Sequence, residues 1–265
     1  MFSAYKLALV LILCTSAWPA PLRVCADPNN LPFSNRQGEG FENELAQMVA
    51  RDLGRAVQYV WIVRRGADLK ALAAGACDVV MGTAAAEKVV PVTRPYYRSS
   101  YVFVTRRGTA IHSFDDPRMK QSRIGLEQLL GADDAAEPPA RALAGRGLLS
   151  RVAWYRLQPN FIQPNQSAVL LDAMKRGEID VAVAWGPVAG YYAHRDSAPV
   201  ALTPVSPQAE NAVPFAFDIA MAVRPGEENL LRNLNAYISR HRAQIDALLR
   251  NYGVPLVEAA VAGNR

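Results

Sequence analysis

The stretch Leu69–Met81 reads LKALAAGACDVVM and decides the fold that we expect for this chain. It has the pattern of a helix that stops at a glycine, followed by an acidic residue and an apolar run typical of a buried strand. The stretch Leu170–Trp185, LLDAMKRGEIDVAVAW, repeats this order. A helix that leads into a buried strand is the repeating unit of a mostly parallel sheet, so two such units predict two α/β lobes with helices on their sheets.

Two further apolar runs set the limits of the lobes. Strand signals at Tyr101–Thr105 and Phe215–Val223 each end in a polar or glycine-containing turn. We therefore assign residues 22–104 and 220–265 to a discontinuous lobe 1 and residues 105–219 to an inserted lobe 2. The chain then crosses twice between the lobes, which predicts a two-strand hinge beside a cleft.

The N-terminus has the pattern of an export signal. Lys6 precedes the apolar run Leu7–Leu13, and small residues follow it. The run is too short to cross a bilayer, and no later stretch reaches the ~20 apolar residues that a membrane-spanning helix needs. The alternative is a buried N-terminal helix. We interpret residues 1–20 as a signal peptide and expect no membrane span in the mature chain.

Export affects the interpretation of the cysteines. Cys25 and Cys77 remain in the mature chain, on segments that we expect to be neighbouring parts of lobe 1. In an oxidising compartment these two thiols can form one disulfide. The alternative is a pair of buried, unreactive thiols, and the sequence leaves both open.

The composition excludes several functional classes. The chain has 265 residues, of which 51% are hydrophobic and 20% charged, which excludes a disordered chain and a disulfide-rich miniprotein. With three histidines, three cysteines and no C-x-x-C, we expect no metal centre, no iron–sulfur cluster and no cofactor. The net charge of +5 is spread thinly, with no basic run interleaved with aromatic residues, so nucleic acid is not an expected partner.

Catalytic signatures are also missing from the sequence. There is no P-loop, no G-x-S-x-G and no H-E-x-x-H. Only Asp27, Glu87 and Asp218 are acids that we place near the cleft, and they form no acid–base pair at a plausible spacing. We therefore expect no catalytic residue and no enzymatic activity.

Open α/β sheets bind ligands at the carboxyl ends of their strands. This rule predicts the following residues at a ligand or partner site in the cleft: Asp27, Asn30, Phe33, Gly82, Thr83, Gln128, Trp185 and Tyr191. Amide and hydroxyl groups orient polar atoms of a ligand, and aromatic rings offer a stacking face. The alternative to a binding role is a purely structural role for each residue. Asn30 would then only stabilise a turn, and Trp185 would only fill the core.

Several segments resemble the type II periplasmic solute-binding proteins of family 3. Within that family they are most similar to the MoxJ/XoxJ-like branch, which is associated with quinoprotein (PQQ-dependent) methanol and alcohol dehydrogenases. The resemblance is carried by Leu22–Phe33 (LRVCADPNNLPF), Gly40–Leu53 (GFENELAQMVARDL), Gly75–Gly82 (GACDVVMG), Thr93–Val104 (TRPYYRSSYVFV), Gly177–Gly190 (GEIDVAVAWGPVAG), Pro214–Val223 (PFAFDIAMAV) and Tyr252–Pro255 (YGVP).

The resemblance implies a two-lobed periplasmic protein without enzymatic activity. It also implies a role in methanol or alcohol oxidation, with the dehydrogenase as partner and assembly or activation of that enzyme as the task. The alternative function is a receptor that delivers a small non-amino-acid ligand to an ABC transporter permease.

The chain departs from the amino-acid receptors of family 3 at both charge anchors. The segment Gly82–Val90 contains no arginine for a ligand carboxylate, and Trp185 stands where those receptors have the acid for a ligand ammonium group. The sequence thus predicts a cleft without the two charge anchors that hold an amino acid. Burying an unpaired charge costs several kcal/mol, so a free amino acid is not the expected ligand.

Overall fold

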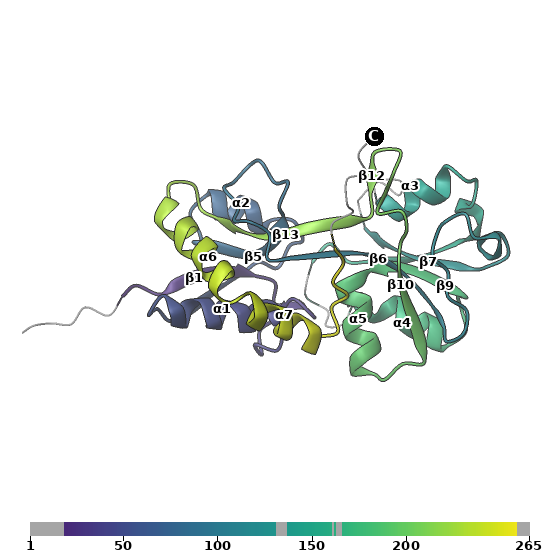
Figure 1. The fold of residues 1–265 in the computed structure, drawn as a ribbon, viewed down its shortest axis with the longest axis horizontal. Helices are drawn as coiled ribbons and strands as arrows, with labels where there is room; N and C mark the ends of the chain where they lie inside the picture. Colours follow the sequence, from purple (N-terminus) through teal and green to yellow (C-terminus); the bar gives the residue numbers. More distant parts are fainter. Residues whose placement is uncertain (1–18, 131–136, 161, 163–165, 259–265) are drawn as a thin grey trace, which may run out of the picture.

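The computed structural model describes residues 19–130, 137–160, 162 and 166–258. Most of the expected signal peptide, residues 1–18, lies outside the described residues. Figure 1 shows two lobes, with the N-terminal strand in one and β7 and β9 in the other. Within the described residues, no helix is both long enough and apolar enough to cross a membrane.

The first lobe is built from segments at both ends of the chain. Its strands are β1 (Leu22–Ala26), β2 (Asn29–Asn30), β3 (Ser34–Asn35), β4 (Val57–Trp61) and β5 (Val79–Ala84). Its helices are α1 (Phe41–Asp52), α2 (Asp68–Ala73), α6 (Glu228–Arg240) and α7 (Arg242–Asn251).

The second lobe comes from the middle of the chain. Its strands are β7 (Ile124–Leu129), β8 (Val152–Leu157), β9 (Val181–Trp185), β10 (Val200–Pro204), β11 (Ala209–Glu210) and β12 (Val213–Pro214). Its α-helices are α3 (Pro138–Ala144), α4 (Val169–Lys175) and α5 (Gly186–Arg195). Short 3₁₀ turns are η1 (Pro117–Lys120), η2 (Leu149–Arg151) and η3 (Gln166–Ala168).

The two lobes repeat one strand arrangement. The order β4-β1-β5 in the first lobe and β8-β7-β9 in the second are both parallel, as the two helix–strand units predict. Each set is extended by a long antiparallel strand, β13 (Ala216–Val223) beside β5 and β6 (Tyr97–Arg106) beside β9. The expected two-lobed α/β fold is confirmed, and the strands at the crossing make each sheet mixed.

Strands β6 and β13 form the connection between the lobes and run side by side there (Figure 1). The residues Tyr97–Ser100 of β6 pair with β13, whereas Tyr101–Thr105 pair with β9 and β10 of the second lobe. The change of partner therefore lies between Ser100 and Tyr101, before the limit at residue 104 that the sequence suggested. A strand can belong to two sheets, and an apolar pattern does not mark the residue at which its partner changes.

The C-terminal segment adds a third contact at the crossing. The Ser99 hydroxyl donates to the carbonyl oxygen of Pro255 at 2.6 Å, and the Val257 N–H donates to the Arg98 carbonyl at 3.1 Å. A Cβ at Gly190 of α5 would lie 2.0 Å from the Gly253 carbonyl oxygen, so this close approach requires glycine. Helix α5 of the second lobe thus contacts the chain that leaves the first lobe.

Each sheet is covered on both faces, as strands that are apolar throughout require. In the first lobe α1, α6 and α7 cover one face and α2 covers the other. In the second lobe α4 and α5 cover one face, while α3 and the segment that begins at Ile111 cover the other. The edges of the sheets that face the other lobe are therefore the places where polar side chains can meet.

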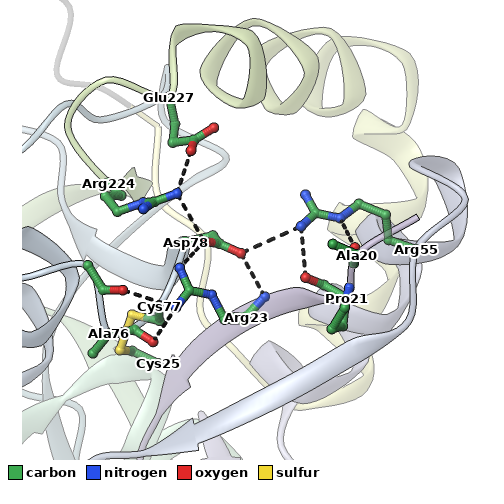
Figure 2. A network of polar contacts seen from close by, with 11 residues as sticks. Ala20, Pro21, Arg23, Cys25, Arg55, Ala76, Cys77, Asp78, Arg224 and Glu227 are labelled. Carbon is green, nitrogen blue, oxygen red and sulfur yellow. Dashed lines mark hydrogen bonds and ion pairs between the residues drawn. A yellow bond between two sulfur atoms is a disulfide. The ribbon is translucent and has the colours of Figure 1, made fainter. Parts of the chain in front are cut away.

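A disulfide and a buried aspartate fix the strands β1 and β5 to each other (Figure 2). The structure places a disulfide between Cys25 and Cys77. Asp78, which is 6% exposed, accepts hydrogen bonds from the backbone N–H and the guanidinium of Arg23 at 3.0 and 2.7 Å. Arg55 and Arg224 lie 3.5 Å from its carboxylate oxygens. Burial alone would raise the pKa of Asp78, but the hydrogen bonds from Arg23 hold it below the ordinary value.

Candidate functional site

A cavity of about 330 Å³ lies between the lobes at the crossing strands. This size is at the lower end of the range for small-molecule pockets. The carboxyl ends of β1 and β5 form its floor, β6 and β13 form one wall, and the end of β9 closes it from the second lobe. The residues that line it are Cys25, Ala26, Asp27, Asn30, Phe33, Glu42, Asp68, Val80, Gly82, Thr83, Ala84, Tyr97, Tyr101, Trp185, Phe217 and Ile219.

The structure brings together six of the eight residues that the sequence placed at the cleft. They are Asp27, Asn30, Phe33, Gly82, Thr83 and Trp185. They lie together because parallel strands end at one edge of a sheet, and β1 is paired with β5.

Gln128 and Tyr191 do not lie in this cavity. Gln128 is inside β7 rather than in the loop after it, and its neighbours Glu127 and Leu129 line an adjacent cavity. Alternate residues of a strand point to opposite faces, which places Gln128 on the other side. Tyr191 is on α5 and lines a separate surface hollow, where its ring stacks on that of Tyr252.

One wall of the cavity is aromatic. The rings of Tyr101, Trp185 and Phe217 contact one another edge to face, with centroids 5.5 to 6.4 Å apart. Tyr101 and Phe217 lie on the two crossing strands, and Trp185 is the last residue of β9. Tyr101 and Trp185 are cross-strand partners, and Phe217 on β13 completes the wall where the crossing strands meet the second lobe.

Three carboxylic acids line the same cavity, of which the sequence placed only Asp27 there. Burial raises the pKa of Asp27 to about 7, although the Asn30 amide, which donates to its carboxylate at 2.8 Å, lowers it. Burial raises the pKa of Glu42 to about 8, and the neighbouring acids Asp27 and Asp68 add to this shift. Glu42 was missed because it comes from α1, which the strand-end rule does not consider.

Gly82 makes room for the Glu42 carboxyl group. A Cβ at this position would lie 2.2 Å from the Glu42 Oε1 atom. The glycine thus lets an acid from α1 reach the end of β5. No side chain of the described residues hydrogen-bonds or ion-pairs with the Glu42 carboxyl group.

A second cavity of about 270 Å³ adjoins the first and shares Asn30, Phe33, Tyr101 and Trp185 with it. Burial raises the pKa of its Glu127 to about 7, against the nearby charge of Arg65, which lowers it. The Tyr101 hydroxyl donates to Glu137 at 2.8 Å. Arg65 supplies the positive charge here, and Arg65 does not line the first cavity.

Two loops join the lobes across the mouth of the cleft. The Arg65 N–H donates to the Pro159 carbonyl at 3.1 Å, and its Nε donates to the Gln158 carbonyl at 3.3 Å. Arg64 and Asn160 form an antiparallel β-bridge, and the Asn29 amide donates to the Ile162 carbonyl at 3.3 Å. These contacts describe a closed arrangement of the two lobes.

The other acids that the sequence placed near the cleft lie elsewhere. Asp218 pairs with Arg98 at 3.0 Å and lines a different hollow. Glu87 accepts hydrogen bonds from the backbone N–H groups of Lys88 and Val89 in an exposed turn. Among the described residues, no three metal-binding side chains come together.

The model of the bacterial extracellular solute-binding proteins, family 3, matches residues 22–254. The chain belongs to this family. The resemblance read from the sequence is thus confirmed, and it covers both lobes of this family 3 protein.

Relatives of the same branch match nearly the whole chain. The family 3 protein is 32% identical to protein MoxJ of Methylorubrum extorquens AM1 over 89% of its own length and 81% of that protein. It is 34% identical to the periplasmic binding protein XoxJ from Methylobacterium extorquens AM1, with a TM-score of 0.73 over 90% of its length and 100% of that chain. MxaJ from Methlophaga aminisulfidivorans is 26% identical, again with a TM-score of 0.73 over 89% and 100% of the two chains. The similarity to MoxJ and XoxJ is therefore confirmed.

Sequence reasoning missed most of the charged and aromatic wall of the cavity. Glu42 follows the buried Phe41 at the start of α1, a position that predicts only a favourable charge at a helix N-terminus. Tyr97 and Phe217 lie at the amino-terminal ends of antiparallel strands, whereas the rule considers the carboxyl ends of parallel strands. The two predicted crossing strands are the sequence signal that could have found them, because residues on strands that cross between two lobes lie beside the cleft.

Proposed function

We propose that this family 3 protein is a non-catalytic periplasmic accessory factor of a PQQ-dependent methanol or alcohol dehydrogenase, which assists assembly or activation of that enzyme. The observation that carries the proposal is its similarity to MoxJ and XoxJ across both lobes, at 32% and 34% identity. The family description as extracellular and the description of XoxJ as periplasmic support the location.

The cleft supports a role other than that of an amino-acid receptor. The main cavity is lined by three acids and, among the described residues, by no lysine, arginine or histidine. The carboxylate of an amino acid would lie in this cavity beside other carboxylates without a cation, which is costly in a buried site. Arg94 does not fill this need, because its guanidinium reaches Ser239 on α6.

Deletion of the gene tests the accessory role. We expect lower PQQ-dependent dehydrogenase activity in the periplasm and slower growth on the alcohol, both restored by the wild-type gene. Affinity purification of the tagged protein from periplasm should recover the dehydrogenase. Normal enzyme maturation in the deletion strain, measured at equal dehydrogenase protein levels, would contradict the proposal.

The second candidate function is an ABC transporter receptor for a small ligand that is not an amino acid. The cavity of about 330 Å³ and the contacts that join the lobes favour it. Uptake assays in the deletion strain separate the two functions. Loss of uptake of one metabolite with unchanged dehydrogenase activity would favour the receptor.

A further inference from the structure

We infer that the cavity between the lobes binds an organic cation, namely an alkylammonium group without a carboxylate on the same carbon. Three features of the cavity carry this inference: acids without a basic side chain beside them, a tyrosine hydroxyl without a hydrogen-bond partner, and an aromatic wall. The inference concerns the ligand of the cleft and does not depend on the role beside a dehydrogenase.

The acids provide the negative charge. Asp27 and Asp68 come from the first lobe with Glu42, and no basic side chain of the described residues lines the cavity with them. Arg65, whose charge lowers the pKa of Asp27, lines the neighbouring cavity with Glu127. A buried carboxyl group is satisfied either by a proton or by a cation, and a cationic ligand in the first cavity would supply the second.

A buried tyrosine provides an independent polar group. Tyr97 is 2% exposed and lines the cavity, and its hydroxyl has no hydrogen-bond partner among the described residues. Unlike the hydroxyl of Tyr96, it is not among the fully enclosed unpaired atoms, so it remains open to a ligand in the cavity. A phenol oxygen accepts a hydrogen bond from an ammonium group, as the carboxylates do.

The aromatic wall suits the alkyl part and the charge of such a ligand. Tyr101, Trp185 and Phe217 contribute ring faces and edges within one cluster. A cation near the face of an aromatic ring is attracted by about 0.5–2 kcal/mol, and alkyl groups gain from leaving water. A neutral alkyl ligand would gain only from the removal of its alkyl group from water.

Divalent metal ions and amino acids fit the cavity less well. The described residues form no cluster of three metal ligands. An α-amino acid adds a carboxylate that meets no cation in the cavity. The ligand class that remains is a monocation with an apolar body, small enough for about 330 Å³.

Calorimetric titration of the purified mature protein with four matched probes tests the inference at pH 8. They are n-butylammonium, n-butanol, butyrate and norvaline, which is butylamine with an added carboxylate. We expect saturable binding of butylammonium at least tenfold tighter than that of the other three. Equal binding of butanol, tighter binding of norvaline, or no saturable binding of any cation would overturn the inference.

A peptide arm distinguishes the source of the cation. Acetyl-Gly-Lys-Gly-amide presents the same butylammonium group on a polypeptide. If both butylammonium and this peptide bind, a lysine side chain of a partner protein is the cation. If only butylammonium binds, the cation is a free small amine. Failure of the peptide and of butylammonium together counts against the inference.

A pair of variants on one helix locates the binding. Glu42→Gln keeps the shape of the side chain and removes its charge, and we expect at least a tenfold loss of butylammonium affinity. Glu44→Gln is the matched control, because Glu44 lies on α1 but does not line the cavity. Thermal unfolding of both variants separates a local loss of affinity from misfolding. Unchanged affinity in a folded Glu42→Gln protein would overturn the assignment.

Discussion

Asp78 in the first lobe and Asp180 in the second make the same set of contacts. Each carboxylate accepts hydrogen bonds from the backbone N–H and the guanidinium of one arginine, Arg23 at 3.0 and 2.7 Å and Arg123 at 2.9 and 2.9 Å. Each arginine also donates to the carbonyl of a glycine, Gly75 for Arg23 and Gly177 for Arg123. Each of these glycines follows the helix that comes just before the aspartate in the chain, α2 or α4. The repeated sequence order thus corresponds to a repeated structural device that joins a helix end to two parallel strands.

The two aspartates differ in exposure, which predicts different costs of removal. The Asp78 side chain is 8% exposed and that of Asp180 is 35% exposed. We expect Asp78→Ala to lower the free energy of unfolding by about 2–3 kcal/mol, because it leaves a cluster of arginines without their buried partner. Asp180→Ala should cost about 1 kcal/mol or less, because water screens the exposed pair. Urea unfolding measures both, and equal losses would contradict the argument.

The disulfide between Cys25 and Cys77 should stabilise the first lobe. It closes a loop with a sequence separation of 52, for which loop-closure entropy gives about 4 kcal/mol as an upper value. We expect the double variant Cys25→Ala/Cys77→Ala to unfold at a clearly lower urea concentration than the wild type. Wild-type protein under reducing conditions is the control and should approach the variant. No difference between the oxidised and the reduced protein would contradict the prediction.

The Arg65 contacts should hold the cleft closed. Arg65→Ala removes the hydrogen bond from Nε to the Gln158 carbonyl and the positive charge beside Glu127. We expect a larger radius of gyration in small-angle X-ray scattering and a further rise in the pKa of Glu127. Arg64→Ala is the control, since the bridge of Arg64 to Asn160 uses the backbone. Equal scattering from both variants would show that these contacts do not determine closure.

The buried acids predict how stability depends on pH. The pKa values of Asp27 and Glu127 rise to about 7 and that of Glu42 to about 8, so the folded protein holds protons that the unfolded chain releases. Their stabilising contribution is complete below the unfolded pKa values near 4 and is lost as pH rises through about 7 to 8.

The measurement is the thermal unfolding temperature of the free protein between pH 5 and 8. We expect it to fall as pH rises, and Glu42→Gln should flatten this slope, since the amide does not titrate. Asp27 and Glu42 face each other, and the other charged and titratable groups near these acids are Asp68, Tyr96, Tyr97, Arg65, Glu137, Tyr101 and Tyr192. An unfolding temperature that rises from pH 5 to 8 would contradict the prediction.

Gly82 offers a test of the Glu42 position. The atom that a Cβ at Gly82 would approach is the end of a flexible side chain, so Gly82→Ala should cost about 1 kcal/mol or less. It should nevertheless displace the Glu42 carboxyl group and shift its pKa toward the ordinary value. Nuclear magnetic resonance of the labelled carboxyl carbon measures this. An unchanged pKa in Gly82→Ala would show that the glycine does not control the acid.

Strand-end reasoning found much of the cleft from the sequence, and its failures have a common cause. Asp27, Gly82 and Trp185 were found because parallel strands end at one edge. Glu42 was missed because it reaches the cavity from a helix, and Gln128 was misplaced because β7 extends to Leu129. The end of a strand and the direction of a helix depend on tertiary contacts that local patterns do not record.

The sequence by itself determined the two α/β lobes, since a helix, a glycine stop and a buried strand occur twice, and local patterns of apolar residues require buried sheets. Only the tertiary structure decided the character of the cleft. An acid on α1, a tyrosine on β6 and a phenylalanine on β13 lie far apart in the chain, and they face one cavity because the hinge brings both crossing strands against the first lobe. The protonation state of a buried acid depends on such non-local neighbours, whereas the formation of a sheet follows from the apolar pattern along its own strands.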